Sequence, residues 1–69
     1  MEAILQTINS NLGECKLLDE WQKLVNDSLP PLKRLRKRSF THLVGSMSRE
    51  GHFMLTKEIS NKNIYYRFE

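Results

Sequence analysis

The spacing of apolar residues changes once along this chain, and that change limits its fold more than any other feature. Before Gly51, apolar residues recur three or four positions apart, and after Gly51 they alternate with polar ones. The first spacing is typical of helices with one buried face, and the second of strands with one buried face. A chain of 69 residues has room for a single domain with one small core. The sequence therefore predicts an α+β domain in which three or four short helices precede a two-stranded antiparallel β-hairpin.

Glycine and proline divide the helical part of the chain. We expect a first helix over residues 2–12, ending near Gly13, and a second over residues 15–28, ending before Pro30. Trp21 is the largest side chain and lies within the apolar stripe of the second helix. It is therefore predicted to anchor the core.

The segment after the two prolines carries two apolar stripes that are out of phase. Leu32 and Leu35 share one helical face, with basic residues on the other, whereas the stripe that begins at Phe40 overlaps the positions of those basic residues. One straight helix would bury cations, which is costly. We therefore predict two short helices with a break near Lys37 to Ser39, and Ser39 as N-cap of the second.

The last segment predicts the hairpin. Strands are expected near residues 53–59 and 63–68, joined by a four-residue loop, Ser60–Asn63. Alternation directs Tyr66 and Phe68 inward and their neighbours outward. The predicted core comprises Ile8, Leu18, Trp21, Leu24, Leu43, Val44, Met47, Leu55, Ile64 and Tyr66.

Charge is distributed unevenly along the chain. Residues 1–31 carry two Lys or Arg against five Asp or Glu, whereas residues 32–69 carry nine against three. Five of those nine cations lie within residues 33–38. Within one domain, 1–69, we therefore distinguish an acidic helical half (1–29), a basic helix-turn-helix-like region (30–50) and the hairpin (51–69). A polyanion is the partner that this distribution favours.

Helices, a basic helical pair and then a hairpin resemble the winged-helix DNA-binding domains, of phage or plasmid type. The resemblance is clearest at Phe40-x-x-Leu43-Val44-x-x-Met47-x-x-x-Gly51-x-Phe53. It implies that the helix near residues 39–50 enters the major groove of duplex DNA and that the hairpin is the wing. No cofactor is implied.

The resemblance and the charge pattern together nominate eleven nucleic-acid-binding residues. They form three groups: a basic tract of backbone contacts, polar residues on the second basic-region helix, and wing residues. These are Lys33, Arg34, Arg36, Lys37 and Arg38; Thr41, His42, Ser46 and Arg49; and Lys62 and Arg67. Gly45, in the same helix, indicates either close approach to a partner or packing under a crossing helix or a kink. Lys62 is equally compatible with a solubilising turn residue.

Other interpretations of the basic tract stay open at this point. It is also compatible with a nuclear-import stretch in a eukaryotic host, or with a solvated helix face. A second function class is a small phage-type inhibitor or adaptor that docks on an acidic partner such as a polymerase. RNA binding through Tyr65, Tyr66 and Phe68 is a third, although alternation leaves no continuous stacking platform.

The sequence argues against an enzyme, a metal site and a membrane protein. Cys15, His42 and His52 match no zinc spacing, and no nucleophile elbow, P-loop or HExxH motif occurs. No apolar run is long enough to span a bilayer, and the first residues do not resemble a signal peptide. A single cysteine suits a reducing compartment, so we expect a cytoplasmic protein, or a nuclear one in a eukaryote. The acidic half is expected to serve as a homodimer or partner surface.

Overall fold

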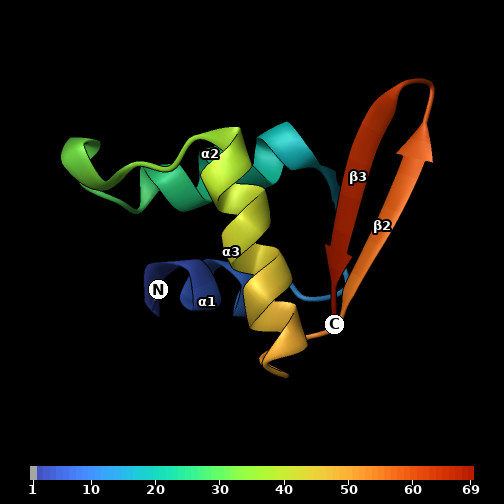
Figure 1. The fold of residues 1–69 in the computed structure, drawn as a ribbon, viewed down its shortest axis with the longest axis horizontal. Coiled ribbons are helices and arrows are strands. Elements are labelled where there is room, and N and C mark those ends of the chain that lie inside the picture. Colours follow the sequence, from blue (N-terminus) through green and yellow to red (C-terminus); the bar gives the residue numbers. More distant parts are fainter. Residues whose placement is uncertain (1) are drawn as a thin grey trace.

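The computed structural model describes residues 2–69, apart from the side chain of Glu2, and it contains three helices and a three-stranded antiparallel sheet (Figure 1). Along the chain the elements are α1 (Glu2–Asn9), β1 (Cys15–Leu17), α2 (Leu18–Asp27), the short 3-10 turn η1 (Pro31–Lys33), α3 (Lys37–Arg49), β2 (Leu55–Ser60) and β3 (Asn63–Phe68). The predicted α+β class is therefore confirmed.

The sheet contains one strand more than the sequence predicts. Its order is β1-β3-β2, so β3 lies in the middle with antiparallel neighbours on both sides. Residues 15–17, which we expected to begin the second helix, pair instead with residues 65–67 of β3. The prediction of a helix over 15–28 was wrong at its start because a three-residue strand is too short to show a spacing of its own. Its stability comes from backbone partners about fifty positions away.

Aromatic rings join the sheet to the helices. Phe68 is fully buried, and the rings of Trp21 and Phe53 meet it edge-on at centroid distances of 4.8 and 4.9 Å. The indole Nε1–H of Trp21 donates a 2.8 Å hydrogen bond to the carbonyl of Tyr66. A buried donor left without this partner would cost about 1–3 kcal/mol. Trp21 is 0% exposed, which confirms it as an anchor of the core.

Most of the predicted core is confirmed, with one clear error. Leu24 is 37% exposed, and Val25 takes the buried position beside it. On α2 the buried residues are Leu18, Trp21 and Val25, so Leu24 lies at the edge of the buried face. Three predicted members are only partly buried, namely Leu43, Leu55 and Ile64. The core also contains Ile4, Phe40, Phe53 and Phe68, which the predicted set omitted.

A glycine ends α3 and turns the chain toward the sheet. The His52 N–H bonds to the Met47 carbonyl and the Gly51 N–H to the Ser48 carbonyl, each at 3.1 Å. These two bonds form a Schellman motif, which requires a left-handed residue, and Gly51 supplies it with φ of 90°. The change in apolar spacing at Gly51 is thus a real boundary between helix and hairpin.

Three other predicted boundaries differ from those in the structure. The first helix ends at Asn9 rather than residue 12, and a turn with Gly13 at φ 82° follows it. The hairpin has a two-residue turn, Asn61-Lys62, both with positive φ, because residues 60 and 63 pair within the strands. Positive φ at both central positions matches the twist of the flanking strands. The first strand of the hairpin, β2, begins at Leu55 rather than at residue 53.

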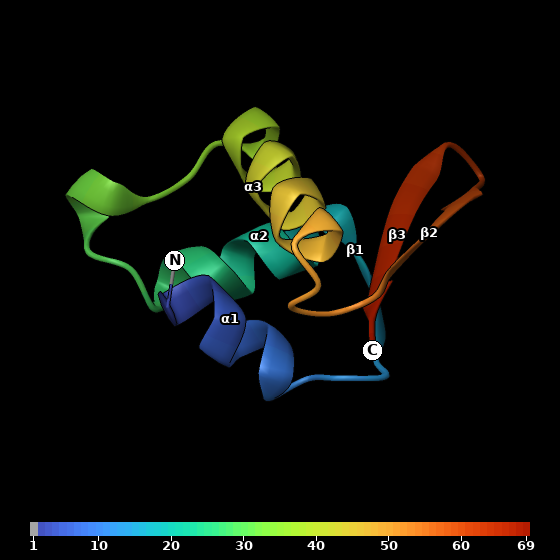
Figure 2. The same ribbon diagram turned by 60° about the horizontal axis from the view of Figure 1, so that its bottom comes forward.

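The basic region departs most from prediction. Leu32 and Leu35 are not on one helical face, since η1 is a single 3-10 turn and residues 34–36 are extended. Residues 30–36, here called the arm, project away from the helices and the hairpin (green in Figures 1 and 2). The predicted break exists but lies at residues 34–36, before Lys37. Arg36 rather than Ser39 is therefore the N-cap of α3, with no side-chain capping bond.

Candidate nucleic-acid interface

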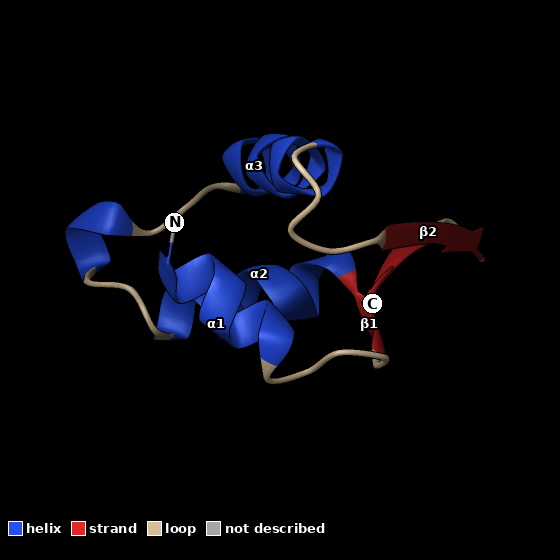
Figure 3. Ribbon diagram, turned by 90° about the horizontal axis from the view of Figure 1, so that it is seen from below, coloured by secondary structure: helices blue, strands red, loops and turns tan. Residues whose placement is uncertain are grey.

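Helix α3 has one buried and one open face. Phe40, Val44 and Met47 pack into the core, whereas His42 and Arg49 are exposed. The helix lies on one side of α1 and α2, and the arm and the hairpin flank it on opposite sides (Figure 3). The open face is therefore bordered by two projecting segments.

Gly45 lies in the middle of that open face. A Cβ built on Gly45 would have only the Arg49 guanidinium nearby, at 3.8 Å, and α3 runs unbroken from Lys37 to Arg49. Packing beneath a crossing helix, one of the two structural explanations for this glycine, is thereby excluded. Gly45 itself is partly exposed, and the Arg49 guanidinium lies beside it.

The arm is fixed to α2 by side-chain amides. The Asn26 Nδ2–H donates to the Leu35 carbonyl at 2.9 Å, and the Asn26 Oδ1 accepts from the Leu35 N–H at 2.8 Å. The Gln22 Nε2–H adds a bond to the same carbonyl at 3.1 Å. The base of the arm is thus held in position by these hydrogen bonds and by Leu35, which is partly buried against the core.

Two cations occupy the first turn of α3, where the helix dipole favours anions. Lys37 is compensated by Asp19, whose Oδ1 lies 2.6 Å from the lysine Nζ. Both side chains are more than half exposed, so this pair contributes at most about 1 kcal/mol. Among the residues that the structure describes, Arg38 forms no ion pair.

The sheet turn and the start of α3 meet at a small pocket. Lys37 and Lys62 both line it, with Asp19 and Asn63, and its volume is about 140 Å³. The pocket joins two segments that are far apart in sequence. It was not predicted, because neither Asp19 nor Asn63 carries a recognisable signal.

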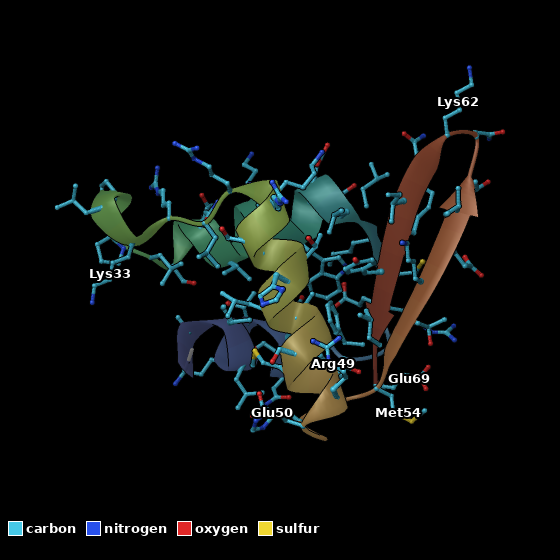
Figure 4. All side chains as sticks on the ribbon, in the orientation of Figure 1. Lys33, Arg49, Glu50, Met54, Lys62 and Glu69 are labelled. Atoms are coloured by element: carbon cyan, nitrogen blue, oxygen red, sulfur yellow. The ribbon has the colours of Figure 1, made fainter. Side chains whose placement is uncertain are left out.

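The remaining cations extend along the longest dimension of the domain, 32 Å between Cα extremes. Lys33 lies at one end and Lys62 at the other, with α3 between them (Figure 4). Within the described part of the chain, Lys33, Arg34, Arg36, Arg49 and Lys62 form no ion pair. Arg67 does not join them: it lies near the end of β3 remote from the turn, and its Nε is 3.1 Å from Glu69 Oε1.

Three polar residues of α3 complete the predicted set. The Thr41 hydroxyl donates to the Arg38 carbonyl at 2.9 Å, and the Ser46 hydroxyl donates to Glu50 Oε1 at 3.3 Å. Both hydroxyls keep lone pairs but have committed their protons, so phosphate contacts from them require rearrangement. His42 is exposed and borders a shallow depression with Arg38 and Ser39.

Two further features are absent from the described residues, 2–69. No helix there is both long and apolar enough to cross a membrane. No group of three or more His, Cys, Asp or Glu side chains there is arranged to hold a metal ion.

Comparison with known proteins found no matching family model, no matching curated protein and no matching solved structure. The site must therefore be judged on its own geometry and charge.

Proposed function

We propose that this protein binds duplex DNA, with the open face of α3 against the major groove and the arm and hairpin turn on the flanking backbone. The observation that carries the proposal is the open face of α3 at Gly45, which lies between Lys33 and Lys62 (Figure 4). Among the described residues, neither of these two cations forms an ion pair. The major groove is wide enough to admit an α-helix, and a position without a side chain lets the helix backbone approach the bases more closely. The role is binding, as part of a regulator or an accessory to DNA transactions, rather than catalysis.

The electrostatics of α3 support an anionic partner. Cations in the first turn of a helix oppose the dipole by about 0.3–1 kcal/mol each. A phosphate bound there would reverse the penalty at Arg38, and it would draw Lys37 away from Asp19. The winged-helix resemblance fits the same arrangement, because α3 is followed by Gly51 and then by the first hairpin strand.

The test is a fluorescence-anisotropy titration of labelled mixed-sequence duplex DNA at several salt concentrations. With three to five phosphate contacts, log K should fall against log salt with a slope of about −3 to −5, because each contact contributes about −0.9. Arg36→Ala with Arg38→Ala should make the slope shallower by about 2 for every sequence. Arg49→Ala should instead change the preference between sequences, because Arg49 is the long donor on the open face.

The matched control removes the same amount of charge elsewhere. Lys23 and Lys57 are exposed and lie on α2 and β2, outside the proposed contacts. Lys23→Ala with Lys57→Ala should leave the salt slope almost unchanged. Equal effects from both double variants would mean that net charge alone, rather than this surface, drives binding. Absence of DNA binding at about 50 mM salt would reject the proposal, and tight binding to an acidic protein would then favour the adaptor class.

A further inference from the structure

One leucine of this domain is entirely outside the core. Leu32 is 100% exposed, the highest value among the large apolar side chains. It lies in η1, the outermost part of the arm, which projects to the far left in Figure 1. A leucine so placed contributes nothing to folding, and it would bury apolar surface only against a partner.

The arm holds Leu32 in a defined position. Pro30 and Pro31 restrict the backbone before it, and the Lys33 N–H closes the turn onto the Pro30 carbonyl at 2.9 Å. Asn26 and Gln22 fix the other side of the arm through Leu35. The side chain is therefore presented at low entropic cost to whatever it meets.

The charges around Leu32 indicate the chemistry of that partner. The next two residues are Lys33 and Arg34, both exposed, and Arg36 and Arg38 follow. No acidic residue lies between residues 28 and 49. An exposed leucine followed by cations is complementary to a polyanion that can also accept an apolar side chain. Duplex DNA is such a partner, because its stacked base pairs lie beneath a phosphate backbone.

We infer that Leu32 is a wedge that enters between base pairs of duplex DNA and kinks it while Lys33 and Arg34 hold the adjacent phosphates. This inference rests on the proposed DNA-binding function and assigns the arm a role distinct from that of α3. Side chains of this type partially unstack a base step and bend the duplex by about 20–90°. Pyrimidine–purine steps unstack most easily, so the wedge should favour TA and CA steps.

The experiment uses the full chain and a duplex rich in TA steps in which some adenines are replaced by 2-aminopurine, which brightens when unstacked. A second duplex carries a donor and an acceptor dye at its ends and reports bending. The wild-type protein should raise the 2-aminopurine emission and bring the ends closer. Leu32→Ala should abolish both signals and weaken binding by about tenfold, from the lost apolar burial. Leu32→Phe should retain both signals.

Lys33→Ala separates charge from insertion. Lys33→Ala should make the salt slope shallower by about 0.9, and the fluorescence signals measured at saturating protein should be unchanged. Leu32→Ala should leave the salt slope unchanged. Because Leu32 is fully exposed, thermal unfolding of Leu32→Ala should match the wild type, which excludes a folding defect.

Each remaining outcome overturns the inference in a recognisable way. If wild-type protein does not bind DNA, the proposed function and the wedge both fail. If it binds with the expected salt slope but neither signal changes, or if Leu32→Ala behaves as wild type, the wedge alone fails. Leu32-dependent binding to phosphatidylserine-containing vesicles without the DNA signals would assign this leucine to a membrane surface instead.

Discussion

Asn26 and Leu35 are joined by two hydrogen bonds in which one side-chain amide satisfies both the N–H and the carbonyl of a single residue. Leu35 lies where the arm returns to the body of the protein, two residues before α3 begins. The amide therefore takes the place of a strand partner for a segment that has no regular structure. It also anchors the backbone between two cations, Arg34 and Arg36.

Replacing Asn26 by alanine should loosen this junction. Two bonds are lost at a part-buried site, so we expect the free energy of unfolding to fall by about 1–3 kcal/mol, measured by urea denaturation. DNA affinity should fall as well, because Arg34 and Arg36 would no longer be held. Gln22→Ala is the matched control: it removes one bond to a carbonyl that keeps its second partner, and its effect should be smaller. Equal losses in the two variants would contradict this account.

Gly45→Ala should have opposite effects on stability and binding. No other element packs on Gly45, and alanine is about 1 kcal/mol more favourable than glycine within a helix, so thermal unfolding should move to higher temperature. If α3 approaches the floor of the major groove, the added methyl group should weaken DNA binding. A more stable variant with unchanged affinity would mean that this face of α3 does not contact DNA closely.

Two variants of Lys62 separate the effect of backbone strain in the hairpin turn from the effect of the lysine charge. Its φ of 68° is unfavourable for a residue with a Cβ, so Lys62→Gly should stabilise the hairpin by about 1 kcal/mol. Lys62→Ala keeps the strain and removes the same charge. Both variants should make the salt slope of DNA binding shallower by about 0.9, while only the glycine variant gains stability. A salt slope unchanged in both would make Lys62 a turn residue without a contact.

Alkaline pH should reveal the burial of Tyr66. Burial raises the pKa of the Tyr66 hydroxyl above its ordinary value near 10, because the charged phenolate would lose hydration. The folded chain then binds the proton more tightly than the unfolded chain. The stability from this group is therefore complete below pH 10 and is lost as pH rises toward the folded pKa.

The measurement is urea denaturation of wild type and Tyr66→Phe across this range. The stability advantage of wild type over the variant should shrink above pH 10, since the variant has no hydroxyl to ionise. Parallel pH dependences for the two proteins would show that Tyr66 does not ionise differently on unfolding.

Local patterns predicted a large part of this fold. The glycine that ends α3, the hairpin and the buried faces of α2 and α3 were all expected, because each follows from residues only a few positions apart. The phase conflict between the basic tract and the Phe40 stripe also predicted a break, but two to three residues too late. The break lies where Gln22 and Asn26 bind Leu35, and no local spacing records these two partners.

The tertiary structure brings some of the predicted binding residues together and leaves others apart. The sequence determined that cations cluster and that α3 has a polar face, since both depend on residue order alone. Only the tertiary structure decided that Lys37 meets Asp19, that Lys62 faces the same pocket, and that Arg67 lies apart beside Glu69. The formation of β1 and the exposure of Leu32 were also decided only by the tertiary structure. Such features depend on pairing or packing with residues that are distant in the chain. The local spacing of residues does not record which distant segments will come together and which will stay exposed.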